Sequence, residues 1–209
     1  MKEIIEFTCT GNQGRSPIAE LIARDHLHKI DAVERYEAAS SGSLAEKIRL
    51  DNVPIGFRLK VIAVAKERGV YTPIELQDIN KAIKEGNDTA IVHYFKKAEY
   101  QFIQEEMKDR VDVLPMFGIE GIIKEKKEQT IAKPDTIAVL SMANTNNNQV
   151  QEIYASSQYN PLIDVLSRYV TGDNKAEIPN SFGLGRKAYI AAVEKLMDYV
   201  PKAVDKLVK

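Results

Sequence analysis

The sequence predicts an α/β fold in which a parallel sheet is covered by helices on both sides. Short runs of strand-forming residues alternate along the chain with segments whose apolar residues recur at helical spacing. Strands that alternate with helices are joined by right-handed crossovers, which makes the strands parallel. A glycine-rich loop lies between the first strand and the first helix. This loop falls at the carboxyl end of the sheet, where such folds bind ligands.

The amino-terminal part of the chain supplies two strands and two helices. Residues 3–8 and 35–40 are expected to be strands, and a helix is expected within residues 54–69. Residues 17–29 are expected to form the first helix, because apolar residues recur there on one face. These residues are Ile18, Leu21, Ile22 and Leu27.

A charged segment, residues 73–134, follows a break at Gly69 to Pro73. We expect a single domain over residues 1–209, in which this segment is a mainly helical insertion between the second and third strands. A structureless loop of ~60 residues is improbable in a compact domain. The insertion is either a cap over the substrate cleft or a structural embellishment. Helices are indicated by the apolar stripe Ile74, Leu76, Ile79 and Ile83 and by the run 96–109. Residues 111–116 fit a strand or a buried connection, and residues 124–128 fit a solvated helix face or a loop.

The carboxyl-terminal part completes the alternation. Residues 136–141 and 162–169 are predicted to be the third and fourth strands, with a helix over 149–156 between them. An amphipathic helix over 189–206 closes the chain, and Pro201 is expected to kink it or to start a new turn.

The composition is typical of a soluble enzyme. The 209 residues are 44% hydrophobic and 28% charged, which suits one sizeable core with a modest cap. A formal net charge of −1 gives no strong field for nucleic acid or an anionic membrane, and no stretch approaches the ~18 apolar residues of a membrane span. No secretory leader precedes the first strand, and a single cysteine suits a reducing compartment. We therefore expect a cytoplasmic protein that binds neither nucleic acid nor membranes.

The loop after the first strand carries the chemistry. Cys9 and Arg15 are separated by five residues that include Gly11 and Gly14. These glycines are expected to permit the positive φ values and close approach with which successive N–H groups curl around one point. Such a nest at the start of a helix binds a tetrahedral oxyanion and favours a thiolate. Cys9 is therefore the predicted nucleophile, and Arg15 is predicted to hold two oxygens of a phosphoryl group.

Ser16 is the third predicted catalytic residue. Its hydroxyl is expected to donate a hydrogen bond to the Cys9 thiolate and to ease the departure of that thiolate from phosphorus. The alternative is that Cys9 is a buried core thiol and that Arg15 is a surface residue at the start of a helix. The combined spacing, glycines and strand-to-helix context favour the oxyanion site.

The segment from Cys9 to Glu20 resembles the amino-terminal signature of the low molecular weight protein tyrosine phosphatases. Residues 37–43 and 135–142 resemble that family's second and third strands, and residues 178–189 resemble its acid loop and last helix, whereas 71–134 have no counterpart. The resemblance implies a four-stranded parallel sheet in three layers and a phosphocysteine intermediate. It also implies that substrate is bound by Thr10, Gly11, Asn12, Gln13, Gly14, Asn180 and Phe182, with Phe182 against a phenyl ring.

Two departures from the family pattern matter for the chemistry. Asn180 stands at the position of the family's catalytic aspartate, and an amide cannot protonate a leaving group, a contribution typically worth ~10² to 10⁴ in rate. Turnover of poor leaving groups is expected to fall unless Asp173 or Glu177 substitutes. Gly14 stands where many relatives carry a second cysteine, so no internal disulfide can protect Cys9.

Three functions are consistent with these residues. The leading hypothesis is a cysteine-dependent phosphatase that acts on a phosphorylated protein or a small phosphate ester without a cofactor. The second is a phosphate-binding protein with little or no turnover, and the third is an arsenate reductase that depends on an external thiol. A metal site is not expected, because His26 and His28 do not share a helix face and no carboxylate or cysteine cluster accompanies them.

Overall fold

The computed structural model describes residues 1–119 and 128–208, and its centre is a four-stranded sheet in which every strand is parallel to its neighbours. The order of the strands is β2-β1-β3-β4. The predicted α/β fold is therefore confirmed, and its first strand lies in the interior of the sheet. The strands are β1 (Glu3–Cys9), β2 (Tyr36–Gly42), β3 (Thr136–Ser141) and β4 (Leu162–Val165).

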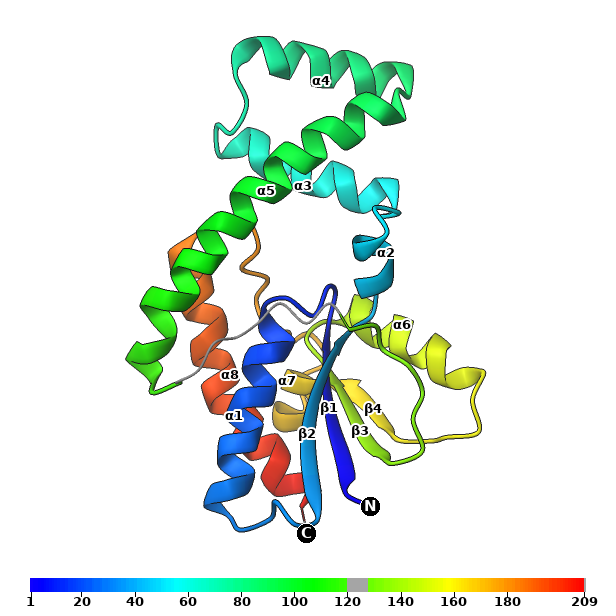
Figure 1. Cartoon of the computed structure of the whole chain (residues 1–209), viewed down its shortest axis with the longest axis vertical. Coiled ribbons are helices and arrows are strands. Elements are labelled where there is room, and N and C mark those ends of the chain that lie inside the picture. The colour runs from blue at the N-terminus through cyan, green and yellow to red at the C-terminus, as the bar shows by residue number, and fades with distance from the viewer. Residues whose placement is uncertain (120–127, 209) are drawn as a thin grey trace.

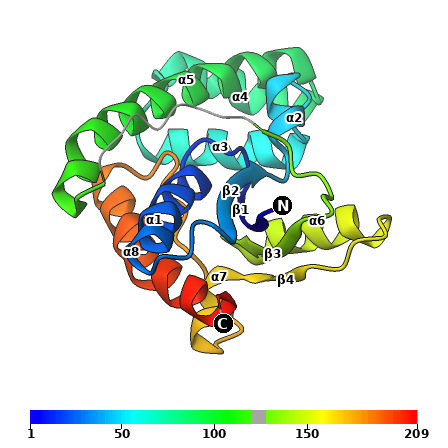
Figure 2. The same ribbon diagram turned by 60° about the horizontal axis from the view of Figure 1, so that its bottom comes forward.

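Helices cover both faces of this sheet, as Figure 2 shows. Successive side chains of β1 point to opposite faces. Ile5, Phe7 and Cys9 belong to the main core with α1 and α8, whereas Glu6 is buried on the other face. The flanking helices are α1 (Arg15–Lys29), α6 (Asn144–Ala155), the short α7 (Leu166–Thr171) and α8 (Arg186–Leu207).

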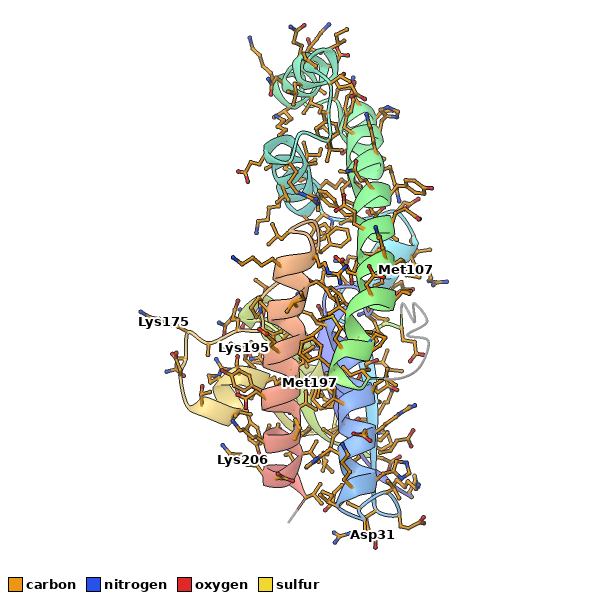
Figure 3. All side chains as sticks on the ribbon, turned by 90° about the vertical axis from the view of Figure 1, so that its left-hand side faces the viewer. Asp31, Met107, Lys175, Lys195, Met197 and Lys206 are labelled. Carbon is orange, nitrogen blue, oxygen red and sulfur yellow. The ribbon has the colours of Figure 1, made fainter. Side chains whose placement is uncertain are left out.

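A second, all-helical part stands above the carboxyl end of the sheet (Figure 1). It has a hydrophobic core of its own, which includes Ile62, Ile79, Phe95 and Phe102. One long helix, α5, leaves this part and runs down beside α1 and α8, and Met107 on it and Met197 on α8 are labelled in Figure 3. The elements are α2 (Ala45–Arg49), α3 (Ile55–Glu67), α4 (Pro73–Glu85), α5 (Asp88–Val113) and the 3₁₀ helix η1 (Leu114–Phe117).

Local sequence signals set the ends of α4 and α5. The Thr72 side chain accepts a hydrogen bond from the Glu75 N–H at 3.3 Å, the Glu75 carboxylate accepts one from the Thr72 N–H, and Pro73 follows the cap. Gly86 ends α4 in the left-handed conformation, with φ 66°. Asn87 then caps α5 by accepting a hydrogen bond from the Ala90 N–H at 3.1 Å.

Several predicted boundaries are wrong. Residues 162–169 are not one strand, because β4 ends at Val165 and α7 begins at Leu166. Residues 111–116 form the end of α5 and part of η1 rather than a strand. The helix expected over 149–156 begins at Asn144, and the last helix begins at Arg186 and continues through Pro201.

Among the described residues of the segment 73–134, the last helical element is η1, which ends at Phe117. After η1, the described residues 128–130 run beside the end of β2, where the Gly42 N–H donates to the Glu128 carbonyl at 2.7 Å and the Thr130 N–H donates to the Gly42 carbonyl at 3.0 Å. Most of the stretch 124–128 lies outside the described residues. Among the described helices, none is both long enough and apolar enough to cross a membrane.

Candidate active site

The loop that joins β1 to α1 forms the floor of a cavity at the carboxyl end of the sheet. The residues of the loop that line this cavity are Cys9 and Arg15 with the intervening Thr10, Gly11, Gln13 and Gly14. Three other parts of the chain close the sides: Ile48 on α2 with Phe57 on α3, Glu99 and Glu106 on α5, and the segment Asn180, Ser181 and Phe182 before α8. The structure thus brings the predicted loop and the predicted acid-loop segment to one cavity.

Hydrogen bonds from the segment after β2 hold the backbone of the loop. The carbonyl oxygens of Cys9 and Thr10 each accept a hydrogen bond at 2.9 Å, from the N–H groups of Ser43 and Leu44. These two carbonyls are therefore turned toward the segment after β2. The N–H groups of such a loop are the kind of donors that stabilise an oxyanion.

Asn12 has a structural role in the loop that the sequence did not reveal. It has φ 52°, whereas neither Gly11 nor Gly14 is among the positive-φ glycines, so the expectation that these glycines supply the left-handed conformation is wrong. Asparagine is one of the residues that tolerate this conformation. Its side chain is fully buried, donates to the Ser40 carbonyl at 3.0 Å and accepts from the Ser40 hydroxyl at 3.1 Å. The Asn12 side chain thus braces the loop and does not line the cavity.

The glycines serve close approach instead. A Cβ atom at Gly14 would lie 2.5 Å from Oε1 of Glu106, and a Cβ atom at Gly11 would lie 3.0 Å from Cδ1 of Ile48. Gly42 at the end of β2 is also tight and meets backbone atoms, because its Cβ would lie 2.7 Å from the Asn12 nitrogen and 2.8 Å from the Gly11 carbonyl carbon. The loop therefore packs directly on the backbone of β2 and on α5.

The thiol of Cys9 has a hydroxyl donor beside it. Cys9 is 5% exposed, and the fully buried Ser16 Oγ lies 3.1 Å from its Sγ. The same hydroxyl lies 3.0 Å from the carbonyl oxygen of Ser41 and 3.4 Å from Oδ1 of Asn12. A hydroxyl has one hydrogen to donate, so these acceptors compete for it.

Arg15 connects the loop to the segment that contains Asn180. Its Nη1 donates to the carbonyl oxygen of Ile178 at 2.9 Å. Burial lowers the pKa of Arg15, while the negative charges of Cys9, Glu106 and Glu177 act in the opposite direction. An arginine stays protonated under these conditions, so a cation lies next to the thiol sulfur.

The two residues considered as substitutes for the missing acid do not line the cavity. The Glu177 carboxylate accepts hydrogen bonds from the N–H and the side chain of Asn144, at 2.7 and 2.9 Å, and so holds the first turn of α6. Asp173 is exposed and accepts from the Lys175 N–H at 2.9 Å within a turn. The cavity carboxylates instead come from α5, which lies in the segment expected to be a cap or an embellishment, and neither Glu99 nor Glu106 was expected at the site from the sequence.

A comparison with solved structures finds the same fold in three phosphatases. A protein tyrosine phosphatase from Entamoeba histolytica in a product-state mimic has a TM-score of 0.58 at 14% identity, and the match covers 99% of this chain and 96% of that chain. A low molecular weight phosphotyrosine phosphatase from Vibrio cholerae has a TM-score of 0.57 at 15% identity, covering 98% and 96%. A mutant of YwlE from Bacillus subtilis has a TM-score of 0.55 at 14% identity, covering 100% of both chains.

These matches define the class of fold. No protein-family model matches the chain, and no curated protein matches it. The chain nevertheless has the three-layer α/β fold of the low molecular weight protein tyrosine phosphatases over its whole length. The resemblance read from the Cys9 loop is therefore confirmed at the level of the fold.

Proposed function

We propose that this protein is a cysteine-dependent phosphatase that hydrolyses phosphotyrosine or a small aryl phosphate. The observation that carries the proposal is the arrangement at the cavity floor, where Cys9 Sγ lies 3.1 Å from the Ser16 hydroxyl in a loop that also places Arg15. A thiolate, an arginine and a curved backbone loop together suit nucleophilic attack on a phosphoryl group.

In the proposed reaction, the Cys9 thiolate attacks phosphorus and displaces the leaving group. Arg15 and the loop N–H groups hold the equatorial oxygens, where negative charge is spread in the transition state. Water then attacks the phosphocysteine and releases inorganic phosphate. The Ser16 hydroxyl stabilises the thiolate that departs in this second step.

The cavity walls support an aromatic leaving group. Phe57 and Phe182 line the cavity together with Ile48, so apolar surface lies above the polar loop. Aromatic rings pack favourably against such side chains. Phe182 is positioned by an edge-to-face contact with Phe102, whose ring centroid lies 5.6 Å away.

The competing interpretation is a phosphate-binding protein without turnover. Asn180 supports it, because the residue lines the cavity and a carboxamide cannot supply a proton. Hydrolysis of para-nitrophenyl phosphate separates the two functions, since para-nitrophenolate leaves without much help from an acid.

We expect the wild type to hydrolyse this ester and Cys9→Ser to lose all activity above background. Phosphate or vanadate binding, measured by calorimetry on the same two proteins, shows whether the loop is intact. A wild type that binds phosphate tightly but releases no nitrophenol would favour the binding protein. Absence of both binding and turnover would overturn the Cys9 site.

A further inference from the structure

The proposed phosphatase lacks a proton donor at the expected position, and α5 offers two carboxylates in its place. Among the described residues that line the cavity, Glu99 and Glu106 are the ones that carry a carboxylate. They are seven residues apart on α5, which is two helical turns, so both project from the same side of that helix.

Glu106 is engaged in holding the phosphate loop. Its Oε1 lies 3.1 Å from Nη2 of Arg110, and that guanidinium also donates to the carbonyl oxygen of Gln13. The same carboxylate lies against Gly14. Glu106 is thus a positioning residue at the edge of the loop.

Glu99 lines the same cavity as the phosphate-binding loop and comes from α5. On α5 it stands between Phe95 and Phe102, one turn from each. The Phe95 ring contacts Phe57 at 6.4 Å between centroids, and the Phe102 ring contacts Phe182 at 5.6 Å. Phe57 and Phe182 both line the cavity, so Glu99 comes from a helix whose rings contact both of these aromatic side chains.

The surroundings of Glu99 allow it to keep a fixed position. Its side chain is 16% exposed, and its Oε2 lies 3.3 Å from Nζ of Lys96. The Lys96 ammonium is shared with Asp51.

We propose that Glu99 is the general acid and base of this phosphatase, a role that rests on the proposed function. As the bond from the thiolate sulfur to phosphorus forms, the bond from phosphorus to the aryl oxygen breaks, and the Glu99 carboxyl proton passes to that oxygen. The product leaves as a neutral phenol. The Glu99 carboxylate then takes a proton from the water that attacks phosphocysteine, which releases phosphate and restores the thiolate.

The test is the dependence of kcat/KM on the leaving group, measured with a series of aryl phosphates from para-nitrophenyl to phenyl. Glu99→Gln should lose about 100-fold or more with phenyl phosphate and much less with para-nitrophenyl phosphate. Glu106→Gln is the matched control from the same helix face. It should change all substrates by a similar factor, because it alters the loop rather than the proton transfer.

A rescue variant separates a chemical role from a structural one. Adding Asn180→Asp to Glu99→Gln places a carboxyl group on another wall of the cavity and should restore hydrolysis of phenyl phosphate. If kcat/KM depends on the leaving group equally in the wild type and in Glu99→Gln, Glu99 is not the general acid. The proposed phosphatase would still stand in that case, provided that Cys9 is needed for hydrolysis of para-nitrophenyl phosphate. A steeper dependence of kcat/KM on the leaving group in Glu106→Gln alone would also overturn the role of Glu99. A wild type without turnover would overturn both the phosphatase function and the role of Glu99.

Discussion

The Oγ of Ser16 lies 3.1 Å from the Sγ of Cys9 at a point where both side chains are almost completely buried. The hydroxyl comes from the first turn of α1 and the thiol from the end of β1. The contact therefore joins the two elements that flank the phosphate-binding loop. In the proposed reaction it acts most strongly when sulfur becomes a thiolate and carries the full negative charge.

Replacing Ser16 by alanine should slow turnover. A hydrogen bond to a charged group contributes about 1.5–3 kcal/mol, so kcat with para-nitrophenyl phosphate should fall by roughly 10- to 100-fold. Rapid-quench measurements should place the loss in the breakdown of phosphocysteine, with a burst of nitrophenol retained. Ser167→Ala is the control, because Ser167 is equally buried and its hydroxyl bonds the Ala176 carbonyl at 2.6 Å. Equal kcat values in Ser16→Ala and the wild type would contradict the role of Ser16.

Two substitutions at Asn12 should separate its backbone and side-chain roles. Asn12→Gly loses the hydrogen bonds with Ser40 but accepts φ 52° without strain, whereas Asn12→Ala loses the same bonds and must also adopt this conformation. Urea denaturation should therefore show Asn12→Ala to be less stable than Asn12→Gly by about 1 kcal/mol. Both variants should bind phosphate less tightly than the wild type. A more stable alanine variant would show that the left-handed backbone at Asn12 carries no cost.

Gly42→Ala should disturb the packing of the phosphate-binding loop on the end of β2. The added methyl group would meet backbone atoms of Asn12 and Gly11 at 2.7 and 2.8 Å, and backbone cannot move aside as a flexible side chain can. We expect a stability loss of about 1–3 kcal/mol and weaker phosphate binding. Gly56→Ala in α3 is the matched control, since a Cβ atom there has nothing within 4 Å. If both variants have the stability and the phosphate affinity of the wild type, Gly42 is not needed for the packing of the loop.

Glu6 should make stability fall as pH rises. Burial on the α6 side of the sheet raises the pKa of Glu6, against smaller opposing effects of Ser41 and Lys133. The folded state thus holds the proton more tightly than the unfolded chain does. The resulting stability is present below the unfolded pKa of about 4.3 and is lost as pH rises through the folded value.

Glu6→Gln removes this titration. The variant's gain in free energy of unfolding over the wild type, measured in urea, should therefore be larger at neutral pH than at pH about 4. The difference between the two proteins cancels the titration of every other group that both share. A difference independent of pH would show that Glu6 has the same pKa in the folded and unfolded states.

Much of the fold follows from local patterns in the sequence. The strands around Ile5 and Val139 contain short apolar runs, and α1 carries the apolar residues Ile18, Ile22 and Leu27, all of which are buried. The error after β4 has a physical cause. Residues 162–169 mix apolar residues with Asp164, Ser167 and Arg168 without a clear period, and such a short segment does not distinguish a strand from a helix.

The Cys9 loop and the wall that contains Asn180 and Phe182 could be predicted from the sequence, but the cavity residues on α2, α3 and α5 could not. Cys9, Arg15 and Ser16 are close in sequence, so spacing alone brings them together. Glu99 reaches the cavity through the packing of α5 on distant elements, and no local signal marks it. Asn12 shows a different limit, because sequence reasoning gave the positive φ to neighbouring glycines when the asparagine adopts it.

The central claim is that phosphorus becomes bonded to Cys9 during turnover. The most direct measurement is mass spectrometry of the protein quenched in acid within milliseconds of mixing with para-nitrophenyl phosphate. The account predicts one added phosphoryl group on the peptide that contains Cys9, formed together with the first nitrophenol and absent from Cys9→Ser. Nitrophenol released by Cys9→Ser at the wild-type rate, with no phosphoryl group on that peptide in the wild type, would contradict it.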